Sequence, residues 1–223
     1  MIRAKLLTEF VGTFGFFSII ALSHEAGQLA PVAIGFGLAA MVYMGGHISG
    51  AHYNPAVSFG LFLRGVMTPL ELGLYWFTQL LAGSLAFVLA DQLSGITPGI
   101  HPGHGVLWYW ALTAEVLFSA SLVLVVLNVA ATKETAGNSY YGIAIGFTVG
   151  AGVLVVGPIS GAAFNPAVGF AATLGAAMFA HGTWSDLWIY IVGPLVGAAI
   201  ATVIHRQQSR PQPIPPERSE RLE

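Results

Sequence analysis

The chain has 223 residues, of which 55% are hydrophobic and 8% are charged. Soluble domains carry charges on about a quarter of their residues, so the composition excludes an ordinary soluble protein and indicates a membrane protein. The formal net charge of -2 gives no reason to expect nucleic acid as a partner. Because cysteine is absent, no disulfide bond supports the fold.

Six apolar stretches are each long enough to cross a hydrocarbon core of about 30 Å, which takes about 20 helical residues. Since lipid offers backbone groups no hydrogen-bond partner, each stretch is predicted to be a helix. The first stretch also resembles a signal peptide, but Glu9 interrupts its apolar run and it has a counterpart in the second half, so a membrane span is favoured. The spans are predicted at 5–22, 31–48, 70–90, 107–129, 140–157 and 187–205.

Basic residues lie on one side of the predicted membrane. If the N-terminus is cytoplasmic, every Lys and Arg falls in an inner segment, which is the distribution that orients membrane proteins. Both termini are therefore predicted to be cytoplasmic, and the polar, proline-rich segment 206–223 is predicted to be a disordered cytoplasmic tail. The basic residues are Arg3, Lys5, Arg64, Lys133, Arg206, Arg210, Arg218 and Arg221.

The sequence contains two copies of one unit. Shifted by 111 residues, segment 33–59 aligns with segment 144–170, and 16 of these 27 positions are identical. Outside this segment, Glu9 in the first span corresponds to Glu115 in the fourth. Since each unit has three spans, the second copy enters the membrane inverted, and such repeats place functional sites near the midplane. The single predicted domain and its two repeats cover residues 1–205, about 5–90 and about 107–205.

Each unit contains the string Asn-Pro-Ala in apolar surroundings. Asparagine is a preferred helix N-cap because its side-chain oxygen accepts a backbone N–H, and proline is favoured at the first helical position. The string therefore predicts a helix start. The apolar residues that follow, 55–63 and 166–174, give helices of about 13 Å at 1.5 Å per residue, which cross half a membrane. The strings are Asn54, Pro55 and Ala56, and Asn165, Pro166 and Ala167.

These short helices are predicted to re-enter the membrane from opposite sides and to meet at their N-termini. Non-helical backbone at that depth is tolerated only where it is buried or lines a water-filled cavity, so the loops before Asn54 and Asn165 indicate a pore. Asparagine amides aimed at a passing oxygen, with two positive helix ends, would orient water and repel cations. The predicted fold is an all-α membrane protein with six transmembrane helices and two re-entrant half-helices in an inverted repeat.

The motifs "EFVGT", "GHISGAHYNPAVS", "ISGAAFNPA" and "WIYIVGPLVGA" closely resemble those of the aquaporin and glycerol facilitator family, the major intrinsic proteins, and the match runs from about residue 5 to 205. The resemblance implies a homotetramer in membrane lipid, with one pore in each subunit, that passes water or small neutral solutes without a cofactor. By position, Asn54 and Asn165 are similar to the family's paired pore donors. Glu9 and Glu115 are similar to its buried carboxylates that hold the re-entrant loops, and His52 borders the first loop, where the match implies loop packing.

The resemblance also locates the family's outer selectivity filter, and there this sequence departs from the family. Water channels typically have an aromatic residue, a histidine, a small residue and an arginine, and glycerol channels keep the arginine. All four positions here are aliphatic, which leaves three consequences open: passage of larger solutes such as glycerol, urea or ammonia, water flow limited by dewetting, or occlusion. The positions are Ile34, Val153, Ala162 and Val168.

Other classes of function remain as alternatives. An ion-coupled secondary transporter also uses inverted repeats and broken helices, but it would be expected to carry more ionisable residues at the midplane than Glu9 and Glu115. An enzyme is not expected, because no nucleophile and base stand together, and a metal site at His47 and His52 would need more ligands. A closed structural or adhesive protein is a third alternative. The short loops favour a prokaryotic cytoplasmic membrane.

Overall fold

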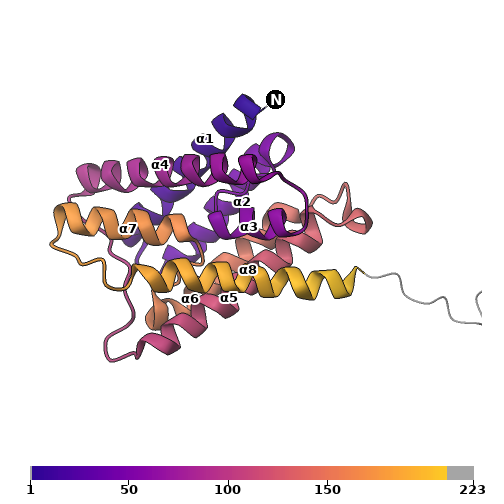
Figure 1. Cartoon of the computed structure of the whole chain (residues 1–223). Coiled ribbons are helices and arrows are strands. Elements are labelled where there is room, and N and C mark those ends of the chain that lie inside the picture. The colour runs from indigo at the N-terminus through magenta and orange to yellow at the C-terminus, as the bar shows by residue number, and fades with distance from the viewer. Residues whose placement is uncertain (1, 210–223) are drawn as a thin grey trace, which may run out of the picture.

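Six long helices and two short ones, joined by loops and two short 3-10 turns, make up residues 2–209, which the computed structural model describes (Figure 1). Within these residues there is no strand. The long helices are α1 Ile2–Leu22, α2 Ala30–Ser49, α4 Pro69–Ser94, α5 Trp108–Ala130, α6 Tyr141–Ser160 and α8 Leu187–Gln208. The short helices are α3 Pro55–Leu63 and α7 Pro166–Phe179, and the turns are η1 Ser23–Leu29 and η2 Lys133–Thr135.

All six predicted spans are present as helices of 20 to 26 residues. By length and hydropathy, Ile2–Ser49 forms one apolar helical stretch of 48 residues. Gly27 in η1 divides this stretch into α1 and α2, because its φ of 53° is not helical. The fold is therefore the predicted all-α membrane architecture.

The two half-helices lie on opposite sides of the bundle, and their first residues point towards its centre (Figure 1). Helix α3 has the nine residues that the sequence predicts, but α7 has 14 rather than nine. The extra turn forms because the apolar, alanine-rich residues 175–179 continue the helix. The helix ends at Phe179, shortly before His181, whose φ of 55° is left-handed, and Gly182, whose N–H donates back to the Ala176 carbonyl.

The halves of the chain meet where α2 packs against α6. Glycines on both helices allow this close approach: a Cβ added at Gly146 would lie 2.3 Å from the Gly35 carbonyl oxygen, and one at Gly35 would lie 2.9 Å from the Gly146 carbonyl oxygen. Small residues let membrane helices bring their backbones together in this way. The matching contacts within each repeat are α1 against α4 and α5 against α8.

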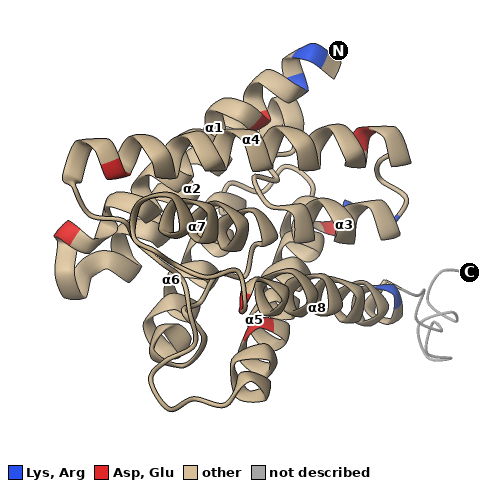
Figure 2. Ribbon diagram, turned by 60° about the vertical axis from the view of Figure 1, so that its left-hand side comes forward, with Lys and Arg blue, Asp and Glu red and all other residues tan. Residues whose placement is uncertain are grey.

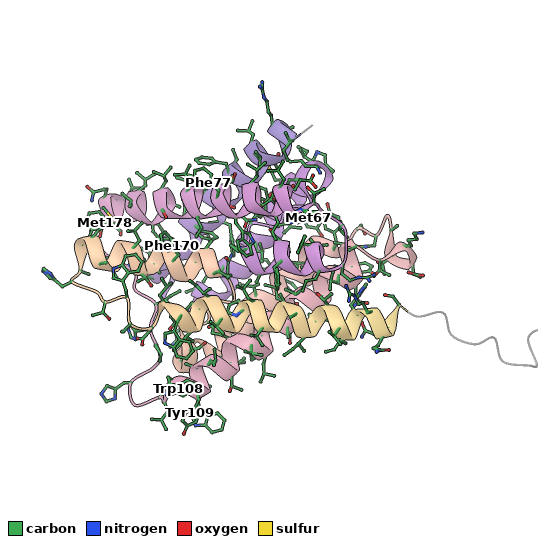
Figure 3. All side chains as sticks on the ribbon, in the orientation of Figure 1. Met67, Phe77, Trp108, Tyr109, Phe170 and Met178 are labelled. Carbon is green, nitrogen blue, oxygen red and sulfur yellow. The ribbon has the colours of Figure 1, made fainter. Side chains whose placement is uncertain are left out.

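Apolar side chains cover the outside of the bundle, as a lipid-facing surface requires. Phe77 on α4 is 67% exposed and points away from the neighbouring helices (Figure 3). Trp108 and Tyr109 project from the start of α5, where Trp108 packs against Trp188 with ring centroids 5.5 Å apart (Figure 3). Tryptophan and tyrosine are enriched at membrane interfaces, so this end of α5 marks one boundary of the hydrocarbon core.

Basic residues gather at the end of the bundle that holds the N-terminus of α1 and the end of α8 (Figure 2). There Lys5 forms an ion pair with Glu71, with 3.1 Å between Nζ and Oε1. Helix α8 continues to Gln208, past the predicted boundary at 205, and in this last turn the guanidinium of Arg206 donates to the Leu63 carbonyl at the end of α3. The predicted disorder of the tail concerns mainly residues 210–223, which lie outside the described residues.

The packing of α2 on α6 predicts unequal effects of alanine at two glycines of α6. Gly146→Ala should destabilise the protein by about 1–3 kcal/mol, the usual cost of overpacking a close contact. Gly157→Ala is the matched control, because a Cβ there meets nothing within 4 Å. Thermal unfolding in detergent checks this. Equal unfolding temperatures for the two variants would show that the glycine contact contributes nothing to stability.

Candidate functional site

The two loops that precede the half-helices have the same unusual backbone. Each begins with a glycine in the left-handed region, Gly50 at φ 90° and Gly161 at φ 88°. Two non-glycine residues in each loop also have positive φ, a conformation that costs about 1–2 kcal/mol per residue. Such strain persists only where the surroundings hold it in place. The four residues are Ala51, Tyr53, Ala162 and Phe164, with φ between 47° and 54°.

The carboxylate of Glu9 holds the first loop. It is wholly buried in α1 and accepts hydrogen bonds from the backbone N–H groups of His52 and Tyr53, at 2.9 and 2.8 Å. The Ser49 hydroxyl, at 2.7 Å, and the Gln79 amide, at 2.9 Å, complete its partners. A carboxylate inside a membrane protein needs such partners. The loop N–H groups therefore stabilise the charge of Glu9, and Glu9 in turn holds the loop in its strained conformation.

Glu115 holds the second loop in the same way from α5. Its carboxylate accepts the N–H groups of Ala163 and Phe164, at 3.0 and 2.7 Å, and the Ser160 hydroxyl at 2.8 Å. Here no amide side chain is a fourth donor, because Pro194 stands at the repeat position of Gln79. The structure therefore brings both predicted carboxylates to the loops that they were predicted to support.

His52 contacts two elements beside the first loop. Its Nδ1 lies 3.0 Å from the Ser58 hydroxyl on α3, and its ring lies 4.9 Å from that of Tyr75 on α4. The Tyr75 hydroxyl donates to the Ser49 carbonyl at 2.7 Å. At the matching place in the second half, the Tyr190 hydroxyl donates to the Ser160 carbonyl, also at 2.7 Å.

The sequence analysis named His52 but missed five other supporting residues, although a signal existed for most of them: Ser49, Tyr75, Gln79, Ser160 and Tyr190. The serine and tyrosine pairs are identical at corresponding positions of the two repeats, which marks them as part of the common framework. Gln79 has no counterpart in the second repeat. The only sequence feature that could have marked Gln79 as a supporting residue was its polar amide within an apolar span.

Both asparagines cap their half-helices as the capping argument predicts. The side-chain oxygen of Asn54 accepts the Ala56 N–H at 2.8 Å, and that of Asn165 accepts the Ala167 N–H at 3.0 Å. The following prolines occupy the first helical position. The N-terminal ends of α3 and α7 are thus brought to the centre of the bundle, each with its positive dipole end.

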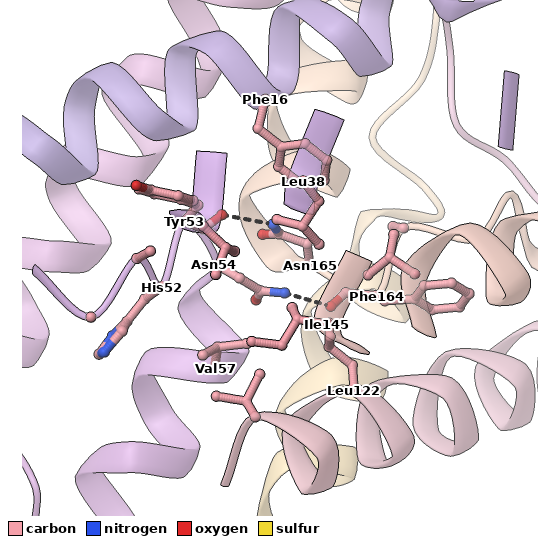
Figure 4. Close-up of a pocket in the computed structure, with 16 residues that line it drawn as sticks. Phe16, Leu38, His52, Tyr53, Asn54, Val57, Leu122, Ile145, Phe164 and Asn165 are labelled. Atoms are coloured by element: carbon pink, nitrogen blue, oxygen red, sulfur yellow. Dashed lines mark hydrogen bonds between the residues drawn. The ribbon is translucent and has the colours of Figure 1, made fainter. Parts of the chain in front are cut away.

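The asparagine amides also join the two loops, which the sequence did not predict. Nδ2 of Asn54 donates to the Phe164 carbonyl, and Nδ2 of Asn165 donates to the Tyr53 carbonyl, both at 2.9 Å (Figure 4). A carboxamide has two N–H donors. One donor of each asparagine is therefore used between the loops, and only the second is left to face a passing molecule.

Three consecutive backbone carbonyls in each loop accept no hydrogen bond from any residue in the range 2–209. Buried carbonyls normally have partners, so these groups are candidate acceptors for a molecule inside the bundle. They belong to Gly50, Ala51 and His52 in the first loop and to Gly161, Ala162 and Ala163 in the second.

A cavity of about 30 Å³ lies where the half-helices meet (Figure 4). Both asparagines line it, and Phe16, Leu38 and Leu122 supply apolar walls. A water molecule needs about 10–15 Å³ of such space, so the cavity has room for a few water molecules. A second cavity of about 460 Å³ adjoins it and is bordered by Lys5, Glu71 and the loop that contains η2.

The four predicted filter residues lie on α2, on α6, on α7 and in the second loop. Ile34 on α2 and Val168 on α7 are 7% and 2% exposed, and Ala162 in the loop is 7% exposed, whereas Val153 on α6 is half-buried. None of the four lines either of the two cavities described above. Among residues 2–209, no three His, Asp or Glu side chains are close enough to hold a metal ion.

Comparison with known proteins identifies one family. The model of the family described as "Major intrinsic protein" matches residues 2–205. The chain is 40% identical over 181 residues to "Probable aquaporin TIP2-2" of Oryza sativa, covering 80% of this chain and 71% of that protein. It is 41% identical over 181 residues to "Aquaporin TIP1-1" of Arabidopsis thaliana, covering 79% and 69%. The structure of the aquaglyceroporin from Plasmodium falciparum superposes with a TM-score of 0.72 over 90% of this chain and 95% of that chain, and at 20% identity this likeness concerns the fold.

The three donors on Glu115 predict a specific loss when its charge is removed. In Glu115→Gln the new amide group must face at least one N–H donor of the loop, which leaves that donor unpaired and costs about 1–3 kcal/mol. The matched control is Glu134→Gln, at an exposed residue of η2. Denaturant unfolding in detergent should show the loss for Glu115→Gln alone. Equal stability of both variants would contradict the holding role of this carboxylate.

Proposed function

The chain belongs to the major intrinsic protein family, and we propose that it is a passive transmembrane channel for water that also admits small neutral solutes. The observation that carries this proposal is the cavity between Asn54 and Asn165. It lies where two helix N-termini meet, has the size of a few water molecules and carries both donors and acceptors.

Water in this cavity can be held without binding tightly. The free carbonyls of the two loops accept its hydrogens on either side of the centre, and the second N–H group of each asparagine donates to its oxygen at the centre. The positive ends of α3 and α7 favour the same orientation. A water file with its oxygens turned to the centre offers no place for a cation, which the helix ends also repel.

The proposed outer filter consists of Ile34, Val153, Ala162 and Val168. These side chains offer passing molecules neither a hydrogen bond nor a charge. A guanidinium at Val168 would narrow the mouth, add fixed donors and repel cations, so its absence favours looser selection among neutral solutes. A facilitator of glycerol, urea or ammonia with little preference for water is the second candidate, favoured by this aliphatic set.

An ion-coupled transporter is less well supported by the site. It would need ionisable groups that meet the path, but the carboxylates of Glu9 and Glu115 are wholly buried and occupied by loop donors. Passive conduction requires neither covalent chemistry nor a cofactor.

The assembly and its placement are part of the proposal. We infer a homotetramer from the resemblance to the family. We infer a placement in membrane lipid with both termini cytoplasmic because the outer surface is apolar and the basic residues lie at one end of the bundle. The relatives named above are plant proteins and give no support to a prokaryotic origin. The proposal therefore keeps the multi-pass membrane placement and leaves out the prokaryotic membrane.

Liposomes that contain the purified protein test the channel directly by stopped-flow light scattering. Under a sucrose gradient they should shrink several-fold faster than empty liposomes, because water crosses through the protein. Gradients of glycerol and urea then separate the two candidates. Slow re-swelling indicates a water-selective channel, and rapid re-swelling indicates a solute facilitator. Rates equal to those of empty liposomes in all gradients would contradict both.

Substitution at Val168 tests its place in the outer filter. Val168→Arg should lower glycerol and urea flux more than water flux, because the guanidinium narrows the mouth while still donating to water. The control is Val168→Leu, which changes size without adding charge. The ratio of solute to water permeability is measured for each variant in liposomes. If Val168→Arg leaves both the solute flux and the water flux unchanged, Val168 does not face the path.

A further inference from the structure

The inverted repeat assigns a partner position to every residue of the proposed outer filter. The shift of 111 residues that aligns the two repeats carries each filter position to a residue of the same type. We call the first set the outer ring, Ile34, Val153, Ala162 and Val168. Its partners are the inner ring, Ile145, Val42, Ala51 and Val57.

The two rings also agree in backbone conformation. Ala51 and Ala162 both have left-handed φ, at 50° and 54°. Val57 and Val168 each stand in the first turn of a half-helix, three residues after its capping asparagine. Corresponding positions therefore present the same side chain from the same local structure on opposite sides of the asparagine pair.

The inner ring lies directly on the path. All four of its residues line the cavity of about 30 Å³ that holds Asn54 and Asn165. Val42 and Ile145 also line the neighbouring cavity of about 460 Å³. Residues shared by a small and a large cavity stand at the neck between them, and Figure 4 shows Val57 and Ile145 beside the Asn54 carboxamide.

The two rings stand at different depths. On α2, Ile34, Leu38 and Val42 follow at intervals of four residues, so they share one face of the helix. On α6, Ile145 and Val153 are likewise eight residues apart. Eight residues of helix span about 12 Å. The cavity wall at Leu38 lies between the two levels, as does the asparagine pair.

We propose that the inner ring is a second size filter equivalent to the outer ring, so that a solute passes two apolar constrictions in series about 12 Å apart. This inference rests on the proposed channel function. Resistances in series add, so widening one of two equal constrictions raises solute flux by at most about twofold. Widening both removes the two resistances together and raises it much further.

Alanine substitutions in each ring test the series arrangement. Ile34→Ala and Ile145→Ala should each raise glycerol permeability in liposomes by less than about twofold, and the double variant should exceed the product of the two single effects. If Ile145→Ala has no effect and the double variant equals Ile34→Ala, the inner ring is no filter. If Ile145→Ala alone gives the full gain, or if the single effects simply multiply, the rings are not equivalent constrictions in series.

Water flow into a sucrose gradient is recorded on the same liposomes. If the wild-type protein conducts no water, the proposed function fails before the rings are tested. If it conducts water and the alanine variants contradict the series pattern, only the present inference fails. Gel filtration in detergent confirms that each variant is folded.

Single cysteines give a second test, because the chain has none of its own. Val57→Cys and Val168→Cys change the side-chain volume little, and mercuric ion bound to either should reduce water permeability by at least about fivefold, because it fills a constriction. Val155→Cys is the matched control, on the outer face of α6, where Val155 is 56% exposed. Full labelling of Val57→Cys, verified by mass spectrometry, without loss of flux would overturn the inner filter.

Discussion

Two reciprocal hydrogen bonds at the centre of the molecule determine what the rest of the structure can do. Asn54 donates to the loop of the second half, and Asn165 donates to the loop of the first. They fix the N-termini of α3 and α7 against each other, so two half-helices act as one interrupted span. The interruption leaves loop carbonyls at a depth where lipid offers no partner, and the proposed channel function would supply one as water in the central cavity.

The loops that carry these carbonyls are strained and are held from behind by two buried carboxylates. The carboxylates of Glu9 and Glu115 accept hydrogen bonds from loop N–H groups, so the loop carbonyls point away from the carboxylates. In the proposed channel, this division leaves neutral polar groups at the centre of the path and the aliphatic side chains of the two rings on either side. On the proposed channel function, selection by size and by hydrogen bonding would follow at the centre, where His52 and Tyr53 are the ionisable side chains among the described residues that line the small cavity.

The sequence predicted much of this arrangement because the repeat and the Asn-Pro-Ala strings have local physical meanings. Span length, N-capping and the start of α3 depend on neighbouring residues alone. The cross-loop hydrogen bonds, by contrast, join Asn54 to a carbonyl 110 residues away, and only the folded chain brings them together. The end of α7 depended on where a left-handed residue interrupts an alanine-rich helix. The support from Gln79 to Glu9 was hidden because the second repeat has proline there. The pore roles of the asparagines and of the filter residues remain predictions.

The continuity of the water path is tested most directly by the temperature dependence of water permeability in liposomes that contain the protein. Water that moves along the loop carbonyls and asparagine amides never dissolves in hydrocarbon. The activation energy should therefore fall well below that of empty liposomes and approach that of diffusion in bulk water. An activation energy equal to that of the empty bilayer would contradict a continuous path through the chain.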